Sequence, residues 1–534
     1  MSGRNNVLRL LAVLLIMSLI AACSGNGGGS QAGPEPSSAP NPAPSSESPG
    51  SAPPADPVEL SVFSWMFEGA DNPDSPIYQK LQEKLNIRLK PVTASWNDWE
   101  EKLNVLIASG EMPDVFISYG VDRPVQYQKW IKEGLVLPIS DYAESYPNIQ
   151  KLLQNFDVLR NVSSGKHYGI PIINKSDGVA ADADHNFFIR KDWLEALNLE
   201  VPKTIDDFYN VAKAFREGDP DGNGAADTYG YTSSSGGIWW NYPIFNAFDT
   251  TTDRWEKVDG KWQPEVLKDE TADALAFLNR MYQEKILDPE FMLNTDDQKI
   301  EKFITGKVGI IFHSGNANFF NGQYYDKFKQ AYPDKDPNSL FTWIGTLVGK
   351  TGKQRINGHA NFWCMTSIRG DLPEEKRTKA LELLDYLASE EGQHLMLYGI
   401  EGIHYEMDGD KIVPLMDQAE KEKDRVFLLK NLVSWNTDFL PEETPNRELI
   451  IEQLKSVSDY AVADPLAYLS VPQEELDPSI NQQLSDFTTE TFVNIIVKSQ
   501  DVYADFEKFK ADWLAKGGDK VIEAFNKQAE LEGR

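Results

Sequence analysis

The stretch that decides the fold begins with Glu59-Leu-Ser-Val-Phe-Ser-Trp65 and ends with Asp114-Val-Phe-Ile-Ser118. Apolar residues alternate with polar ones in the first segment, and the last is a short, mostly apolar run, so both predict strands. Between them, residues 75–85 and 96–109 have the apolar spacing of helices, and Ile87-Arg-Leu-Lys90 is a short strand candidate. Strands that alternate with helices in this way form βαβ units. The sequence therefore predicts an α/β fold with a largely parallel sheet.

The same alternation continues along the chain. Further strands are expected at 186–190 and 306–312. Thr204 is a candidate N-cap, because Asp206 and Asp207 follow it in what would be the first helical turn. Other helices are expected at 191–197, 270–285, 298–305 and 373–398, the last a single long amphipathic helix, and the chain after about 430 is mostly helical.

Composition and charge exclude several classes of protein. Of the 534 residues, 41% are hydrophobic and 25% charged, which is ordinary for a globular chain. The 82 acidic residues outnumber the 52 basic ones and give a net charge of −30, so phosphate backbones and anionic lipid headgroups should repel the protein. Only two cysteines are present, which excludes a disulfide framework, an iron–sulfur cluster and a cysteine-rich zinc module. We expect no nucleic-acid partner.

The first 22 residues predict an export signal. Arg4 and Arg9 precede an uncharged, mostly apolar run at 10–22. This run is shorter than the ~20 residues that span a membrane, so a signal peptide fits better than an anchor helix. It closes with Ile20-Ala-Ala-Cys23, which resembles the lipobox of bacterial lipoproteins, in which the cysteine is lipidated and becomes the mature N-terminus. The alternative is a plain secretory signal with Cys23 incidental. Cys364 should then be a buried thiol.

Residues 24–57 predict a disordered linker behind the lipidated Cys23. Of these 34 residues, 9 are Pro, 8 Ser and 6 Gly, with no aromatic side chain. Such a segment cannot bury enough apolar surface to fold. We therefore expect an extracytoplasmic protein held to the outer face of the cell membrane by its N-terminal lipid alone.

The order of these segments resembles that of the bacterial extracellular solute-binding protein family 1, the lipoprotein receptors of ABC importers for sugars. The resemblance is to the large oligosaccharide-binding branch, which includes the alginate-binding proteins. It covers essentially the whole chain after the linker. It is carried, after the lipobox, by residues 110–115, 168–171, 187–208, 303–307 and 399–405. It implies two α/β lobes joined by a hinge, with the ligand in the cleft between them. By this analogy the N-terminal lobe comprises 58–174 plus 307–366, and the C-terminal lobe comprises 175–306 plus 367–534.

A cluster of oxygen-bearing side chains at 219–227 predicts a calcium site. Asp219, Asp221, Asn223 and Asp227 occupy positions 1, 3, 5 and 9 of an EF-hand loop, with Gly224 at position 6 and Ala225 free to offer its carbonyl at position 7. The departure is at position 12, where Gly230 replaces the bidentate glutamate. The alginate-binding relatives hold structural Ca²⁺ in a similar loop, and the resemblance implies the same here. The alternative is a turn that holds no ion.

Aromatic residues near strand ends and in glycine-rich loops predict a sugar-binding surface. The apolar faces of sugars stack on aromatic rings, and their hydroxyls pair with polar side chains. The aromatic candidates, with one neighbouring amide, are Trp65, Trp239, Trp240, Trp363, Tyr405, Trp435 and Asn436. The other polar candidates are Glu68, Asp122, Asn316, Glu401 and His404. The competing interpretations are core packing for the aromatic residues and solvated surface for the polar ones.

Signatures of catalysis are weak. The chain has no Gly-x-Ser-x-Gly elbow, and its six histidines never fall at zinc spacing. Gly345-Thr-Leu-Val-Gly-Lys-Thr351 has three residues between its glycines where a P-loop has four, so we interpret it as a surface loop. We expect a monomeric, non-enzymatic receptor that binds an oligosaccharide and delivers it to the transmembrane subunits of an ABC permease. The alternative is a secreted carbohydrate-active enzyme, a lyase or glycosidase, built on a carboxylate pair.

Overall fold

The computed structural model describes most of the chain after the linker. The chain divides into two compact units, Met1–Pro54 and Ala55–Arg534, and every described residue belongs to the second. The described residues are 56–65, 72–95, 98–118, 124–155, 159–161, 164–173, 185–234, 238–317, 319–358, 362–409, 411–416, 420, 422–424, 426–433, 445–462, 464–466, 469, 476–477 and 479–534. The predicted signal peptide, Cys23 and nearly all of the linker lie outside them.

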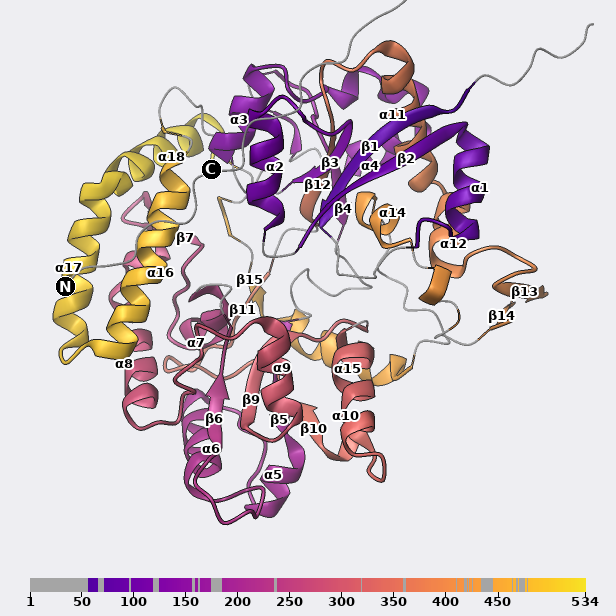
Figure 1. The fold of residues 1–534 in the computed structure, drawn as a ribbon. Helices are drawn as coiled ribbons and strands as arrows, with labels where there is room; N and C mark the ends of the chain where they lie inside the picture. The colour runs from indigo at the N-terminus through magenta and orange to yellow at the C-terminus, as the bar shows by residue number, and fades with distance from the viewer. Residues whose placement is uncertain are drawn as a thin grey trace, which may run out of the picture. The chain divides into compact units, whose positions relative to one another are not determined.

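The first sheet has five strands in the order β2-β1-β3-β12-β4 (Figure 1). Strand β1 is parallel to β2 and β3, whereas β12 is antiparallel to β3 and β4. The sheet is therefore mixed rather than largely parallel as the sequence predicts. Its strands are β1 (Val58–Trp65), β2 (Ile87–Ala94), β3 (Val115–Ser118), β4 (Ile170–Ile173) and β12 (Phe362–Ile368). Pro91 is tolerated within β2 because β2 is an edge strand.

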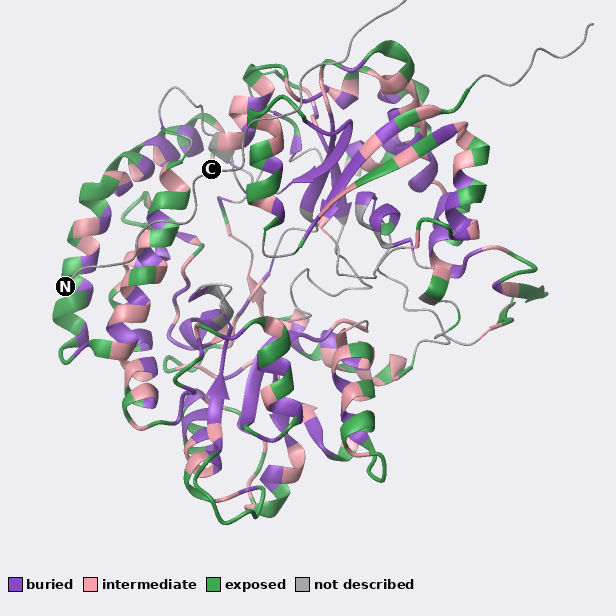
Figure 2. Cartoon of the chain, in the orientation of Figure 1, coloured by how far each residue is buried: buried purple, intermediate pink, exposed green. Residues whose placement is uncertain are grey.

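The helices that follow these strands complete the first lobe. They are α1 (Pro76–Leu85), α2 (Trp99–Ala108), α3 (Pro124–Lys132), α4 (Pro147–Asn155), α11 (Glu374–Leu387), α12 (Glu390–Tyr398) and α14 (Phe427–Leu432). Leu60, Val62 and Phe116 are fully buried in the core between sheet and helices, and Figure 2 shows the central strands as buried. Cys364 is buried in the same core, as predicted.

The second sheet has four strands in the order β10-β5-β9-β6. They are β5 (His185–Arg190), β6 (Tyr229–Thr232), β9 (Val308–Ser314) and β10 (Phe341–Trp343). Strand β6 is parallel to β9, and β5 is antiparallel to both β9 and β10. The carboxyl ends of β6, β9 and β10 therefore meet at one edge, together with the beginning of β5. We call this the carboxyl edge of the second lobe.

Ten helices of the described chain complete the second lobe. They are α5 (Lys191–Ala196), α6 (Ile205–Glu217), α7 (Tyr242–Asn246), α8 (Asp269–Gln283), α9 (Asp296–Ile304), α10 (Asp326–Ala331), α15 (Arg447–Ser458), α16 (Ile480–Lys498), α17 (Val502–Trp513) and α18 (Asp519–Leu531). Thr204 caps α6 as predicted, in a capping box with Asp207. Helices α16 and α17 pack on α8 (Figure 1).

Three short pairs of strands complete the described structure. They are β7 (Trp255–Val258) with β8 (Lys261–Pro264), β11 (Ile356–Asn357) with β15 (Ala461–Val462), and β13 (Tyr405–Asp408) with β14 (Lys411–Pro414). The β11–β15 pair joins two segments of the second lobe that are about a hundred residues apart in sequence. No helix in the described part of the chain is long and apolar enough to cross a membrane.

The predicted boundaries of the lobes are wrong in two places. Residues 308–358 belong to the second lobe rather than the first, because β9 pairs with β5 and β6. Residues 367–433 belong to the first lobe, because α11 and α14 pack on β1. The first lobe is thus 58–173 plus 362–433, and the second is 185–358 plus 445–534. Residues 174–184, 359–361 and 434–444, which follow or precede these ranges, lie outside the described residues.

The long helix predicted for 373–398 is two helices, α11 and α12. Ser389 interrupts it in an extended backbone conformation (φ −79°, ψ 160°), and its hydroxyl accepts a hydrogen bond of 3.1 Å from the amide of Gly392. Ser389 is therefore the N-cap of a new helix, a role that serine favours because its side chain replaces the missing helical acceptor. Because the apolar spacing continues across the break, the sequence predicts a single helix.

Candidate functional site

The carboxyl edge of the second lobe positions polar side chains at the ends of three strands. Strands β6, β9 and β10 end at Thr232, Ser314 and Trp343. In open α/β sheets, ligands bind beyond the carboxyl ends of the strands, where loops and helix termini offer polar groups. This edge is therefore the first place to look for a binding site.

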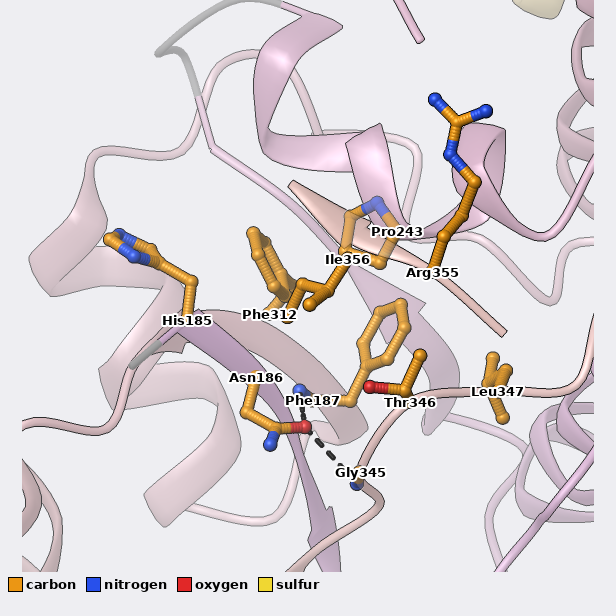
Figure 3. A pocket seen from close by; sticks show the side chains of 10 residues that line it. All are labelled: His185, Asn186, Phe187, Pro243, Phe312, Gly345, Thr346, Leu347, Arg355 and Ile356. Atoms are coloured by element: carbon orange, nitrogen blue, oxygen red, sulfur yellow. Dashed lines mark hydrogen bonds between the residues drawn. The ribbon is translucent and has the colours of Figure 1, made fainter. Parts of the chain in front are cut away.

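A small pocket lies at this edge (Figure 3). Phe187, Pro243, Phe312 and Ile356 form its apolar part. Asn186 and Thr346 lie at one end of the view in Figure 3, and the side chain of Arg355 extends from the other. Its free volume is about 10 Å³, room for one water molecule, whereas pockets that enclose whole ligands usually measure about 300–1,000 Å³.

The amide of Asn186 has a fixed orientation. Its Oδ1 atom accepts hydrogen bonds from the backbone N–H groups of Phe187 at 2.8 Å and Gly345 at 3.1 Å. Two backbone donors cannot face the NH₂ group, so the oxygen must occupy this position. The Nδ2 atom is buried and donates to no described residue. The Thr346 hydroxyl is likewise buried without a partner among the described residues.

Arg355 is held in the pocket wall by Glu265. Its Nη2 atom lies 2.7 Å from Glu265 Oε2, and the glutamate side chain is only 2% exposed. Arg254 approaches the other carboxylate oxygen with its Nε atom at 3.5 Å. Two guanidinium groups thus flank one buried carboxylate. Glu265 orients Arg355 and does not itself line the pocket.

A second charged cluster lies at the same edge, where α9 begins. Asp296 accepts a hydrogen bond from the Ser234 hydroxyl at 2.6 Å, and Lys299 Nζ lies 3.0 Å from Asp296 Oδ1. His313 Nε2 lies 3.9 Å from the same oxygen. Burial alone would raise the pKa of Asp296, but the charges of Lys299 and His313 outweigh it and hold this pKa below its usual value. This cluster ties β6 and β9 to α9.

Hydrogen bonds anchor both ends of the loop that carries Trp239 and Trp240. At the first end, the carbonyl of Ser233 accepts from Asn294 Nδ2 at 3.2 Å. At the other end, Asn241 Oδ1 accepts from the Tyr231 hydroxyl at 3.1 Å. The two tryptophans lie in a single 3₁₀ turn, Ile238–Asn241, that contacts β9. The turn is thus held beside the carboxyl edge, and the side chains of the two tryptophans lie outside the description.

Two predicted contacts, Trp65 and Asn316, lie at carboxyl ends of strands. Trp65 is the last residue of β1, half-buried against the first core. Asn316 follows β9 and has a local structural role: its Nδ2 donates to Ser314 Oγ at 2.9 Å, and its Oδ1 accepts from the amide of Phe319 at 3.2 Å. Trp65 remains a prediction as a ligand contact, and so does Asn316, whose amide is occupied within its own loop.

Three other predicted contacts lie together at the base of the β13–β14 hairpin. Glu401 is exposed, and Tyr405 is half-buried, with its ring 6.1 Å from that of Tyr398. His404 is 2% exposed: its Nδ1 accepts from the amide of Ile400 at 2.9 Å, and its Nε2 donates to Asp424 at 3.2 Å. Both ring nitrogens of His404 are thus hydrogen-bonded within the protein and stabilise the base of the hairpin. The structure does not support His404 as a ligand contact.

The remaining predicted contacts are not described in full. Glu68, Asp122, Trp435 and Asn436 lie outside the described residues, and of Trp239, Trp240 and Trp363 only the backbone is described. Glu68 follows β1 and Asp122 follows β3 in sequence, both parallel strands of the first sheet. These residues remain predictions.

The predicted calcium loop joins α6 to β6. Asn223 Nδ2 donates to Asp221 Oδ2 at 2.7 Å and to Asp227 Oδ1 at 3.2 Å, so those two carboxylates approach one point. Asp219 accepts from the amides of Asn223 and Gly224. Burial and the neighbouring Asp219 raise the pKa of Asp221, as expected where carboxylates crowd.

The loop in this conformation does not yet present a closed cage of oxygens. In the described part of the chain no three His, Cys, Asp or Glu side chains converge closely enough to hold a metal ion. Lys307 Nζ lies 2.7 Å from Asp227 Oδ2 and neutralises part of the negative charge. The donor set consists of the hard oxygens that Ca²⁺ prefers, but a bound cation requires the Asn223 amide to turn and Lys307 to withdraw.

The structure explains why Gly230 stands where an EF-hand has glutamate. This residue lies in β6, and a Cβ atom there would come within 2.2 Å of the Ala212 carbonyl oxygen on α6. No side chain fits at that position. The twelfth ligand is therefore excluded by the close packing of β6 on α6.

Sequence reasoning missed the residues of the pocket. His185, Asn186 and Phe187 lie in or beside a predicted strand, but nothing local shows that they meet Thr346 and Arg355. The stretch 345–351, interpreted as a surface loop, does form a loop, and its first three residues line the pocket. No local signal in the sequence could have found them, because the antiparallel pairing of β5 brings them together.

Comparisons with known proteins agree on one family. Residues 69–394, more than half of the chain, match the model of the bacterial extracellular solute-binding proteins. The polygalacturonan/rhamnogalacturonan-binding protein YtcQ of Bacillus subtilis (strain 168) is 25% identical over 542 residues, which cover 98% of each chain. Lipoprotein LipO of the same organism is 29% identical over 343 residues, 62% of this chain and 64% of LipO.

A solved structure shows the same fold. The EF-hand mutant of the Streptococcus pneumoniae ABC-transporter substrate-binding protein FusA, in complex with fructo-nystose, superposes with a TM-score of 0.69 at 20% identity, covering 89% of this chain and 99% of that one. At that identity the likeness concerns the fold. The match over 69–394, on a chain built of two mixed α/β sheets, shows that this chain belongs to the bacterial extracellular solute-binding protein family.

Proposed function

We propose that this protein is the receptor of an ABC importer for carbohydrates and that it binds an oligosaccharide. The observation that carries the proposal is the family match over residues 69–394 of a chain built on two mixed α/β sheets. Relatives named for polygalacturonan and solved with fructo-nystose support the carbohydrate class.

We expect the ligand to contact both lobes. The proposed contacts on the first lobe are Trp65, Glu68, Asp122 and Trp363, and those on the second lobe are Trp239 and Trp240. Trp435 and Asn436 are further proposed contacts. An oligosaccharide that contacts both lobes favours their closed arrangement by its differential affinity for it, and release then accompanies opening. The protein acts by this population shift and makes or breaks no bond.

We further propose that the chain is exported and anchored by a lipid on Cys23, with residues 24–57 as the tether. The lipobox-like Ile20-Ala-Ala-Cys23 and the relative named Lipoprotein LipO support this. The partners are then the transmembrane subunits of the permease, reached from the outer face of the membrane. The receptor is a monomer.

Calcium is the metal that we propose for the loop at 219–227. The side chains of Asp219, Asp221, Asn223 and Asp227, with the carbonyl of Ala225, would hold the ion. Its positive charge would offset the crowded carboxylates and rigidify the connection between α6 and β6. The FusA structure that carries an EF-hand mutation supports such a loop in a relative. The ion is structural, because the loop lies away from the carboxyl edge.

A ligand screen tests the receptor proposal. The chain without its first 22 residues, carrying Cys23→Ser, is heated with neutral and acidic oligosaccharides, amino acids and peptides. A ligand at about 100 times its dissociation constant adds roughly 2.7 kcal/mol of stability, which is readily detected. Stabilisation by one glycan class, with a single-site calorimetric titration and no product formed, supports the proposal. Turnover of a glycan, or stabilisation only by peptides, contradicts it.

A further inference from the structure

The carboxylate of Asp296 has one oxygen that the fold does not use. Its Oδ1 atom accepts from the Ser234 hydroxyl at 2.6 Å and lies 3.0 Å from Lys299 Nζ and 3.9 Å from His313 Nε2. Within the described part of the chain no hydrogen bond or ion pair reaches the other oxygen, Oδ2. The side chain is 31% exposed, so Oδ2 is open to a ligand.

Asp296 lies at the carboxyl edge of the second lobe. It contacts Ser234, just beyond the end of β6, and His313, next to the end of β9. The chain after Ser234 leads into the 3₁₀ turn Ile238–Asn241, which carries two predicted tryptophan contacts and itself contacts β9. Sugar sites combine aromatic rings, on which the apolar face of the ligand stacks, with polar groups that pair with its hydroxyls. Asp296 supplies such a polar group at the edge where the tryptophan turn lies.

The cluster keeps this carboxylate charged. Burial would raise the pKa of Asp296, but the charges of Lys299 and His313 hold this pKa below its usual value. The ammonium of Lys299 has no exposed side-chain surface, and burying a charge is costly even when it is paired. A structural connection between β6 and α9 requires only the acceptor at Oδ1, which an asparagine would provide without a second negative oxygen. The cluster therefore maintains a charge that the packing of α9 does not need.

The chemistry of a charged carboxylate restricts what can meet Oδ2. An ionised carboxylate only accepts hydrogen bonds, so its partner must donate. A sugar hydroxyl can donate, and a hydrogen bond to a charged acceptor is stronger than one between neutral groups. A carboxylate on the sugar would bring a second negative charge close to the first and be repelled. The unit that fits is a ring with free hydroxyls and no charge.

We propose that Asp296 is a specificity-determining ligand contact, whose Oδ2 atom accepts a hydrogen bond from a hydroxyl group of an uncharged sugar unit. Ser234 and Lys299 hold the carboxylate in that orientation through Oδ1. This rests on the proposed function as a carbohydrate receptor and adds one contact, together with the charge of the sugar unit that meets it.

The first test compares Asp296→Asn with Asp297→Asn. Asparagine retains an oxygen for Ser234 and Lys299 but has no charge. Asp297 is the matched control, because it is an exposed aspartate in the same first turn of α9. Both variants and the unchanged sequence are made without the first 22 residues, carrying Cys23→Ser, and are titrated calorimetrically with galacto- and fructo-oligosaccharides of two to four rings. For the neutral sugar that binds most tightly, we expect Asp296→Asn to lose at least tenfold in affinity and Asp297→Asn less than twofold. Equal affinities in the two variants overturn the inference.

The second test separates a ligand contact from a structural role. The same three proteins are titrated with oligogalacturonates of two to four rings and with their methyl esters, and the ratio of the two dissociation constants is compared. A partly unfolded variant binds both ligands more weakly by the same factor, so the ratio does not change. Removing a negative charge beside the bound ring favours the acid over the ester.

We expect Asp296→Asn to shift this ratio at least fivefold toward the acid, and Asp297→Asn to leave it within twofold. An unchanged ratio in Asp296→Asn overturns the inference and leaves the receptor proposal standing. Binding of acids alone, without esters or neutral sugars, has the same consequence. Where neutral sugars bind and neither member of the acid and ester pair does, the first test decides. Binding of no glycan by the unchanged sequence overturns both the inference and the receptor proposal.

Discussion

The Nζ atom of Lys299 lies 3.0 Å from Oδ1 of Asp296, although no part of the lysine side chain is exposed. Burial lowers the pKa of Lys299 to about 8, and the carboxylate of Asp296 opposes that shift. The ammonium also donates to Ser234 Oγ at 3.1 Å, so one buried charge joins the first turns of α9 to the end of β6.

Removing Asp296 should lower the free energy of unfolding more than removing the charge of Lys299. Asp296→Ala leaves a buried ammonium unpaired, so we expect the free energy of unfolding to fall by about 3 kcal/mol. Lys299→Met replaces the ammonium with an apolar side chain of similar length and leaves a partly exposed carboxylate, so we expect a loss of about 1 kcal/mol or less. Urea denaturation of both variants at pH 7 measures the difference. Equal losses would mean that the pair does not hold this edge.

Asp464 should make stability depend on pH. Burial raises its pKa from 3.8 to about 7. The native state therefore retains a proton that the unfolded state releases, and this contribution to stability declines as the pH rises from about 4 to 7. Asparagine keeps the oxygen that accepts from the amides of Trp255 and Leu466 but cannot ionise. We expect Asp464→Asn to be more stable than the unchanged chain by about 2–4 kcal/mol at pH 8, and equal to it near pH 4. Parallel stability curves over this range would contradict the assignment.

Lys307 should weaken the binding of calcium by competing for Asp227. Removing its charge in Lys307→Gln frees the carboxylate oxygen that lies 2.7 Å from Nζ, so we expect Ca²⁺ to bind several-fold more tightly. Asp221→Asn should bind it several-fold more weakly. Lys350→Gln is the control, because Lys350 is paired with Asp206, outside the loop. Titration with Ca²⁺ followed by thermal stability measures all three. Unchanged affinity in both loop variants would remove the metal from this site.

Gly309 should not tolerate a side chain. A Cβ atom there would lie 2.1 Å from Phe215 Cδ2 and 2.9 Å from Trp193 Cε3, both buried rings of the second core. We expect Gly309→Ala to lower the free energy of unfolding by about 2–3 kcal/mol through overpacking. Gly322→Ala meets nothing within 4 Å and should change it by less than about 0.5 kcal/mol. Chemical denaturation compares them, and a tolerant Gly309 would mean that the core rearranges freely.

Much of the local structure could be predicted from the sequence. The alternation in 59–65 and the cap at Thr204 with Asp207 predicted β1 and the beginning of α6, because both features involve neighbours within a few residues. The helix break at Ser389 was not predicted, because the apolar spacing continues across it and only the backbone conformation reveals the new N-cap.

The partition into lobes could not be predicted in the same way. The sequence of β9 predicts a buried strand but not its partners. Its place beside β5 and β6 depends on residues far away in sequence. The same holds for Gly230: the spacing predicted a calcium loop with a missing ligand, and the carbonyl of Ala212 on α6 supplies the reason.

The sequence by itself determined the strands and helices, the acidic character of the chain and the candidate lipidation site at Cys23. Periodicity, charge and short motifs are properties of neighbouring residues. Only the tertiary structure decided which strands share a sheet and which polar atoms meet. Asn186, Thr346 and Arg355 form one pocket because β5 is antiparallel to β9 and β10, and because Glu265 holds Arg355 from another part of the chain. Which polar atoms meet depends on residues that are distant in sequence, so no local pattern predicts it.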